Sequence, residues 1–126
     1  MKTVAVENAP KAIGPYSQGA VAGGFLFTAG QIPLDPSTMK LVEGDIGVLT
    51  NRVIDNLEAV LAGAGCRLTD VVKSTVFLVD LAEFAGMNEV YARRVGDHRP
   101  ARSTVQVAKL PAGARIEIEM VARIPG

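Results

Sequence analysis

Apolar residues change their spacing along this chain, and that change limits the possible folds more than any other feature. Between residues 46 and 61 they recur every three or four positions, which predicts one face of a helix that ends at Gly63 and Gly65. A second helix is expected after Asp80, with Glu83 three residues on as in a capping box, and it closes at Gly96. The apolar positions are Ile46, Leu49, Val53, Leu57, Val60 and Leu61 in the first helix, and Leu81, Phe84, Met87 or Asn88, Tyr91 and Val95 in the second.

Segments on either side of the helices have the alternation and the β-branched residues that are typical of strands. A short strand at residues 3–6 precedes a hairpin at 19–30 that turns at Gly23-Gly24. Three more strands are expected, at residues 71–79, in the second half of RPARSTVQV (99–107), and at 115–123. The order β-β-β-α-β-α-β-β predicts a single α+β domain over residues 1–126, in which one mixed sheet carries both helices on one face.

The strands also predict which side chains share a face. In the strand at 71–79, one face should hold Val72, Val76 and Leu78, and the other Val71, Phe77 and Val79. In the last strand, one face should hold Ile116, Ile118, Met120 and Ala122. Since two helices cover only one face of a sheet, another subunit is the simplest cover for the second face. That uncovered face is expected to mix Phe77, Val79 and Val121 with Arg102 and Glu119.

Composition argues against several classes of function. The chain has 13 Lys and Arg against 13 Asp and Glu, so no net charge attracts nucleic acid or a membrane. With one His and one Cys it lacks the ligands of a His/Cys zinc site, and it has no GxSxG, Walker A or GxGxxG motif. No metal or other cofactor is therefore expected. Cys66 cannot form an internal disulfide and the N-terminus has no apolar signal segment, which favours a cytoplasmic location.

Six segments, in order and with compatible spacing, resemble the Rid family, which is also known as the YjgF or L-PSP family. They are AIGPYSQG (12–19), FTAGQIPLDP (27–36), VVKSTVFLVDL (71–81), MNEVYARRVGD (87–97), PARSTVQVAKLPAGA (100–114) and IEIEMVA (116–122). The RidA subgroup, the reactive intermediate (imine/enamine) deaminases, is the most similar. The resemblance implies a homotrimer of chorismate-mutase-like subunits around a central barrel, with three ligand clefts between neighbours. It also implies hydrolysis of 2-aminoacrylate and similar enamine or imine acids to 2-keto acids and ammonia.

The same resemblance implies the site residues. Arg102 in PARS and Glu119 in IEIE match the catalytic positions. Thr104 stands where some family members have Cys, which removes any thiol-based role there, and the contact expected at that position comes from the backbone. The substrate-binding positions are Tyr16, Gly30, Asn88, Arg102 and Thr104.

Each of these residues also has a structural interpretation. Arg102 suits a substrate carboxylate because its planar fork binds both oxygens, but it could instead pair with Glu117 or Glu119. Glu119 could orient or deprotonate the attacking water, or it could face Arg115 or Arg123 as a rim carboxylate.

The other candidates have ordinary structural roles available. Tyr16 could pack on the turn at Pro15, Asn88 could be an exposed helix position, and Gly30 could mark a bulge or a strand end. Cys66 is interpreted as a buried filler and His98 as a loop residue, and neither is assigned to catalysis.

Two other functions compete with deamination. The same trimeric cleft could bind 2-keto acids without turnover, as a sensor or scaffold, although the presence of Arg102 favours the enzyme. Ribonuclease or translation-inhibitor activity is the second alternative. Zero net charge, 5% aromatic residues and the lack of a basic stripe argue against it.

Overall fold

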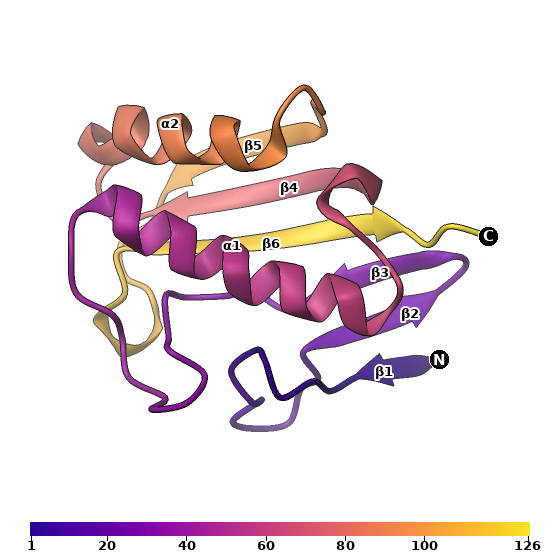
Figure 1. Ribbon diagram of the computed structural model, residues 1–126. Coiled ribbons are helices and arrows are strands. Elements are labelled where there is room, and N and C mark those ends of the chain that lie inside the picture. The colour runs from indigo at the N-terminus through magenta and orange to yellow at the C-terminus, as the bar shows by residue number, and fades with distance from the viewer.

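The computed structural model covers residues 1–126 and contains one six-stranded sheet with both helices on the same face (Figure 1). The helices are α1 (Ile46–Gly63) and α2 (Phe84–Val95). The strands are β1 (Lys2–Val4), β2 (Gly19–Ala22), β3 (Phe25–Thr28), β4 (Val71–Leu78), β5 (Ala101–Gln106) and β6 (Ile116–Arg123). The predicted order of elements, the single mixed sheet and the placement of both helices are confirmed.

The strands lie in the order β1-β2-β3-β6-β4-β5, so β1 and β5 are the two edges. All neighbours are antiparallel except β4 and β5, which run parallel. A parallel pair needs a long crossover between its strands, and α2 supplies it. This connection places α2 directly over the β5 edge (Figure 1).

The core lies between the helices and the sheet. As predicted, α1 turns Leu49, Val53, Leu57, Val60 and Leu61 inward, and all are buried. From the sheet, β6 contributes the predicted apolar face of Ile116, Ile118, Met120 and Ala122. Neither helix is long and apolar enough to cross a membrane.

The beginning of the second helix differs from the prediction. Asp80 does act as a cap, because its carboxylate accepts the Ala82 N–H at 2.9 Å. The segment Leu81–Glu83 forms only a 3-10 turn, however, and α2 begins at Phe84. Glu83 completes no capping box, since its carboxylate binds Arg115 instead. Leu81 and Phe84 are consequently exposed, and the buried positions of α2 are Met87, Val90, Tyr91 and Val95.

A bulge at the start of β4 reverses the predicted faces of two valines. The register with β6 shifts between Val71 and Lys73, which leaves Val72 as the extra residue. Val71 is therefore only 1% exposed and lies in the core, whereas Val72 is 43% exposed. The prediction holds further along, where Val76 and Leu78 are buried and Phe77 is not.

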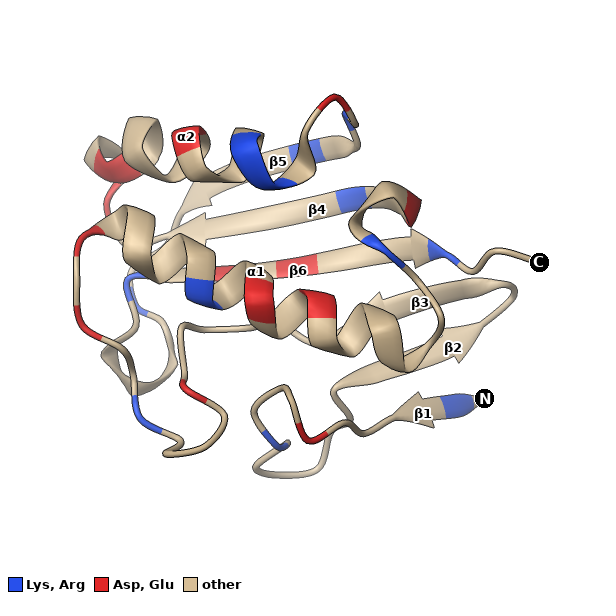
Figure 2. Ribbon diagram, in the orientation of Figure 1, with Lys and Arg blue, Asp and Glu red and all other residues tan.

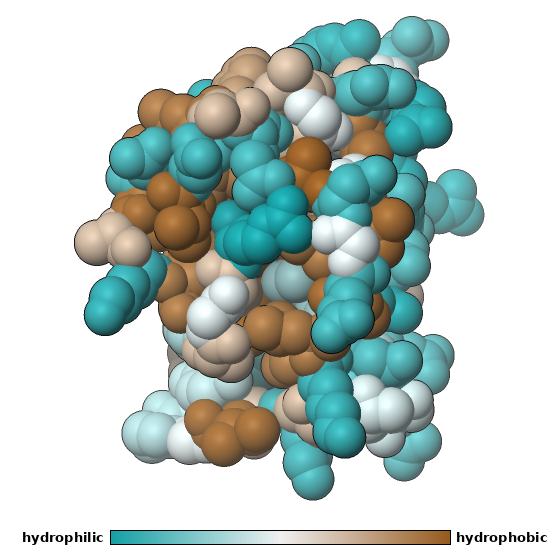
Figure 3. Space-filling view, turned by 90° about the vertical axis from the view of Figure 1, so that its left-hand side faces the viewer, coloured by the Kyte–Doolittle hydropathy of each residue, from teal (hydrophilic) through white to brown (hydrophobic).

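The sheet face opposite the helices has no cover within the chain. Phe25 and Phe27 on β3, Phe77 on β4, Val105 on β5 and Val121 on β6 stay wholly or partly exposed. We call this surface the open face. Figure 3 views the molecule from the left side of Figure 1, where apolar residues also lie between hydrophilic ones. An uncovered sheet face was expected, and the exposed apolar side chains confirm it.

Candidate functional site

Arg102 lies on the helix side of β5, which corrects its predicted place on the open face. It pairs in register with Ser74 of β4, whose side chain is buried beneath the helices. Residues opposite each other on neighbouring strands point to the same face of a sheet. The guanidinium carbon lies 4.7 Å from the ring centre of Tyr91 and 5.5 Å from that of Phe84, both from the crossover that precedes β5. Arg102 is thus held against two aromatic rings under α2.

No acidic side chain neutralises Arg102. The ion pairs of the chain join Arg94 to Asp55 and Glu58, and Arg115 to Glu83. The structural alternative, an ion pair with Glu117 or Glu119, is therefore not formed. Stacking on aromatic faces also leaves the N–H edges of a guanidinium available for a planar, bidentate acceptor such as a carboxylate.

Arg102 and Asn88 both line a cavity of about 430 Å³. Asn88 is half-buried on α2, so it is not the fully exposed helix position that was one alternative. His98 also lines the cavity, and its Nε2 lies 2.6 Å from the Val71 carbonyl oxygen, which holds the ring in place. Arg99 is a lining residue that the sequence did not single out, and it donates to the His98 carbonyl at 2.9 Å.

Thr104 follows Arg102 on the same side of β5, opposite Val76. Its Oγ1 is buried and has no hydrogen-bond partner. Val107 donates its N–H to Leu78 of β4 at 2.8 Å, and N–H directions alternate along a strand. The N–H groups of Arg102 and Thr104 therefore point to the free edge of the sheet. A backbone contact from Thr104 is compatible with this geometry.

The Tyr91 ring beneath Arg102 is fixed by a buried hydrogen bond, and this leads to a first prediction. Its hydroxyl lies 2.6 Å from Ser74 Oγ. Tyr91→Phe should lower the free energy of unfolding by about 1–3 kcal/mol, because it leaves a buried serine hydroxyl without a partner. Denaturant unfolding at a fixed protein concentration measures this loss. Adding Ser74→Ala should restore part of the stability; a double variant less stable than Tyr91→Phe would contradict the assignment.

Glu119 lies on the open face, as predicted. It is opposite Thr75 in the β4–β6 register, and it is exposed. The alternative role as a rim carboxylate facing Arg115 or Arg123 is not seen, since Arg115 binds Glu83 and Arg123 forms no ion pair. Figure 2 shows the acidic positions in the middle of β6 and a basic one near its C-terminal end. Glu119 is thus a carboxylate without a cationic partner in the chain.

Gly30 adjoins Glu117, the other acidic residue on this face of β6. A β carbon added to Gly30 would lie 2.7 Å from both Cδ and Oε1 of Glu117, so a larger residue here would force the Glu117 side chain to move. The register runs from Phe27 opposite Val121 to Gln31 opposite Ile118, which leaves one residue extra on this side. This is the bulge that was one interpretation of Gly30. The Gly30 N–H has no acceptor in the chain, so it is also available to a ligand.

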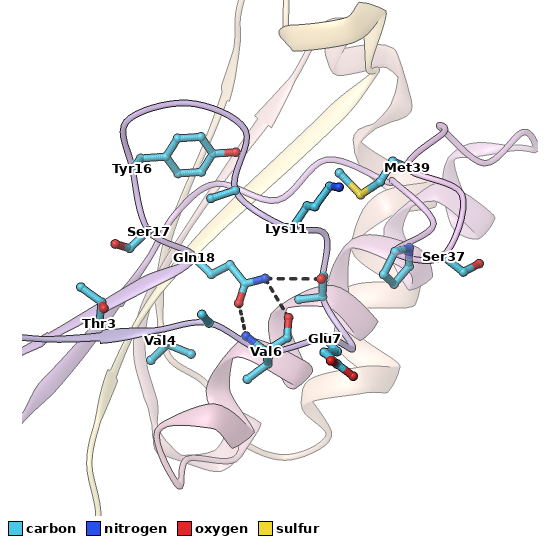
Figure 4. Close-up of a pocket in the computed structure, with 14 residues that line it drawn as sticks. Thr3, Val4, Val6, Glu7, Lys11, Tyr16, Ser17, Gln18, Ser37 and Met39 are labelled. Atoms are coloured by element: carbon cyan, nitrogen blue, oxygen red, sulfur yellow. Dashed lines mark hydrogen bonds between the residues drawn. The ribbon is translucent and has the colours of Figure 1, made fainter.

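Tyr16 lies apart from the other candidate residues, on the loop that precedes β2. Its hydroxyl accepts the Ile13 N–H at 3.3 Å, and its side chain is 54% exposed. It lines a second cavity of about 520 Å³ beneath that loop, together with Lys11 and Met39 (Figure 4). Gln18 secures the loop by accepting the Val6 N–H and donating to nearby carbonyl groups, as the dashed lines of Figure 4 show.

Five of the candidate residues therefore form two separate groups within one chain, and Tyr16 belongs to neither. Arg102, Asn88 and Thr104 lie on the helix side at the β5 edge, whereas Gly30 and Glu119 lie on the open face near β3 and β6. No hydrogen bond or ion pair joins the two groups, and β4 separates β5 from β6. No three His, Cys, Asp or Glu side chains come close enough together to hold a metal ion. Cys66 is buried near the Arg123 carbonyl, away from both groups, and burial raises the pKa of its thiol.

Comparison with known proteins identifies the family. A family model described as Endoribonuclease L-PSP matches residues 6–124. The chain is 53% identical over 121 residues to a RutC family protein of Pyrococcus horikoshii, with 96% of each chain covered. It is 45% identical over 124 residues to the 2-iminobutanoate/2-iminopropanoate deaminase of Escherichia coli, again with 96% of each covered. The crystal structure of E. coli TdcF with bound serine matches 98% of both chains with a TM-score of 0.93 and 40% identity.

These matches show that the chain has the fold of a class of small α+β proteins, in which a single mixed sheet carries two helices on one face. The chain belongs to the L-PSP family, also called the YjgF or Rid family, as its sequence motifs indicated.

Proposed function

We propose that this protein hydrolyses reactive 2-enamine and 2-imine acids, such as 2-aminoacrylate, to 2-keto acids and ammonia. The observation that carries the proposal is the Arg102 guanidinium, stacked on Tyr91 and Phe84 without an acidic partner. Such a group suits the carboxylate of a small acid, which it binds through two parallel hydrogen bonds. The deaminase name of the E. coli relative and the serine bound to E. coli TdcF support a ligand of this kind.

The proposed site needs more than one copy of the chain. We infer a homotrimer in which each cleft takes Arg102, Asn88 and Thr104 from one copy and Gly30, Glu119 and Tyr16 from the next. Two features support this assembly. The two groups are separate within the chain, and the apolar open face lacks cover.

The chemistry in such a cleft requires positioning more than strong activation. Imines already hydrolyse in water, so a charge clamp and a placed water supply useful acceleration. Arg102 would hold the substrate carboxylate, and the free N–H of Gly30 would donate to the ligand. Glu119, which has no cationic partner, would take a proton from the water that attacks the imine carbon.

The test follows both products of the reaction. Purified protein is added to a system that generates 2-aminoacrylate, and the release of keto acid and ammonia is measured against the spontaneous rate. A clear acceleration is expected. Binding of pyruvate without acceleration would instead make the protein a keto-acid-binding sensor or scaffold, and the proposal of an enzyme would then be wrong.

RNA cleavage should be assayed in parallel, because the matching family model carries the name of an endoribonuclease. The chain has no net charge, and its Lys and Arg residues are scattered over the molecule rather than gathered on one surface (Figure 2). A backbone-binding nuclease needs a concentrated basic surface. We therefore expect no RNA cleavage above the background of a mock purification.

A second prediction concerns assembly. The chain mass is 13.2 kDa, and sedimentation or light scattering in dilute buffer should give about three times that mass. The expected cause is burial of the open face, whose Phe25, Phe27 and Val105 remain in contact with solvent in the single chain. A monodisperse monomer would leave the two groups of site residues apart, and would contradict the proposed cleft.

A further inference from the structure

Glu117 adjoins two residues of the proposed site, and the proposed function gives it no role. It lies two positions before Glu119 on the same face of β6, so the two side chains are neighbours. Its carboxyl group packs against Gly30, where an added β carbon would lie 2.7 Å from its Cδ and Oε1. Glu117 is half-buried, whereas Glu119 is exposed. The two carboxyl groups are therefore neighbours on one face of β6 but differ in burial.

No positive charge compensates this pair. On β6 itself, Arg115 is bound to Glu83 and to the Gly44 carbonyl. Arg123 is at the far end of the strand and forms no ion pair.

The neighbouring strands supply one further cation, Lys73 of β4, and it forms no ion pair with either carboxyl group. On β4, the residues opposite are Thr75 and Phe77, and Lys73 donates to Ser103 Oγ at 3.1 Å. The β3 side contributes Phe27 and Gly30, which carry no charge. Burial, and secondarily the charge of Glu119, raises the pKa of Glu117 above its usual value. Burial together with a neighbouring like charge favours the protonated form of Glu117.

We infer that Glu117 and Glu119 act as a pair that shares one proton, with Glu117 the group that donates it to the imine nitrogen of the substrate. This inference rests on the proposed deaminase function and adds a second catalytic residue to it. In the proposed trimer, the Arg102 guanidinium brought to this face by a neighbouring copy is matched by the substrate carboxylate, so it does not neutralise the pair.

The proton balance closes over two steps. In the first, the oxygen of water forms a bond to the imine carbon and gives one proton to Glu119. The electron pair of the C=N π bond moves to nitrogen, which takes the Glu117 proton, and a carbinolamine results. In the second step, the nitrogen takes the proton now on Glu119, the C–N bond breaks with its electrons on nitrogen, and ammonia leaves. The hydroxyl group returns its proton to Glu117 as the C=O bond forms.

The test is a pH profile of turnover for wild type, Glu117→Gln and Glu43→Gln. Gln keeps the size of the protonated acid but cannot donate its proton, so Glu117→Gln should lose about 100-fold in kcat. Wild-type kcat should fall as pH rises through the raised pKa of Glu117, and the variant should lack that alkaline limb. Pyruvate binding should stay within about twofold, since the carboxylate clamp is untouched. Glu43 is exposed and unpaired, so Glu43→Gln should behave as wild type.

Stability gives a readout that does not depend on turnover. A carboxyl with a raised pKa in the folded state binds more protons there than in the unfolded chain, so wild-type stability falls as pH rises through that range. Glu117→Gln has no such group. The melting temperature of Glu117→Gln minus that of wild type should therefore increase as pH rises from 4 toward neutrality. A difference in melting temperature that does not change with pH would contradict the shared proton.

The outcomes separate this inference from the proposed function. A wild-type protein that releases no keto acid overturns both. An active wild type with equally active Glu117→Gln overturns only the role of Glu117. If Glu117→Gln does not fold, Glu117→Asp replaces it, because Asp keeps an acid on a shorter side chain. That variant should be slower but retain the alkaline limb, and loss of the limb would contradict the inference.

Discussion

Arg102→Ala is expected to lower kcat/KM for 2-aminoacrylate hydrolysis by about 30- to 1000-fold while the protein stays folded. The reason is the loss of a bidentate, partly desolvated carboxylate contact, which is worth about 2–4 kcal/mol in the transition state. Arg102 binds no acidic side chain, so its removal leaves no carboxylate of the protein uncompensated. Keto-acid release per folded trimer, measured beside the melting temperature, gives the two quantities needed.

Two further variants define what Arg102 contributes. Arg102→Lys keeps the charge but loses the planar fork, so it should retain only a trace of activity. Arg93→Ala is the matched control, because Arg93 is exposed on the same crossover helix, forms no ion pair and does not line the Arg102 cavity. It should act as wild type. A folded Arg102→Ala trimer with the wild-type rate would show that this residue does not clamp the substrate.

A purely structural Arg102 would give a different pattern. Its stacking on Tyr91 and Phe84 contributes about 0.5–2 kcal/mol if it acts only as a cation–π contact. Arg102→Ala would then melt earlier, and activity would fall only in proportion to the folded fraction. The rate per folded trimer distinguishes the two cases.

Regular elements could be predicted because local spacing determines them. The period of three or four residues between Ile46 and Leu61 defines α1, and Gly65, at a φ of 75°, lies just beyond its end as expected. Strict alternation from Ile116 to Ala122 likewise fixes the buried face of β6. In both cases a single element packs one face against one core. The spacing of its apolar residues therefore predicts the buried face without knowledge of the neighbouring elements.

The side of the sheet on which Arg102 lies could not be predicted in this way. Its strand places the polar residues Arg102, Thr104 and Gln106 at one set of positions and Ala101, Ser103 and Val105 at the other. Neither set has the run of large apolar residues that marks a core face, so only the parallel register with Ser74 determines the face of Arg102. That register depends on how α2 returns the chain to β5, which is a tertiary property. The bulge at Val72 was hidden for a related reason, since Val71 and Val72 suit a buried position equally well.

The candidate site was predicted only as a set of residues. Motif resemblance selected Arg102, Asn88, Gly30 and Glu119 and implied clefts between subunits, but it did not show which of these residues lie together in one chain. Glu117 was considered only as an ion-pair partner for Arg102, since the sequence does not reveal how closely it packs on Gly30. The packing itself is what distinguishes Glu117 from Glu119.

Glu119→Gln should reduce turnover at neutral pH by about 100-fold or more, because an amide cannot accept a proton from the attacking water. Pyruvate binding and the mass of the assembly should be unchanged, since Glu119 is exposed and forms no ion pair. Glu89→Gln, at an exposed acidic position of α2, is the matched control for loss of one negative charge. A turnover equal to wild type would show that Glu119 is dispensable.

The same variant also tests whether the two carboxyl groups act together. Removing the charge of Glu119 should lower the pKa of Glu117, although burial, the larger cause of its elevation, remains. Carbon-13 NMR titration of the side-chain carboxyl measures that change directly. If the pair holds one proton in common, Glu117→Gln with Glu119→Gln should be little slower than Glu119→Gln alone, because residues that act as a unit are strongly non-additive. Independent roles would instead multiply the two losses, and that result would show that Glu117 and Glu119 do not act as a pair.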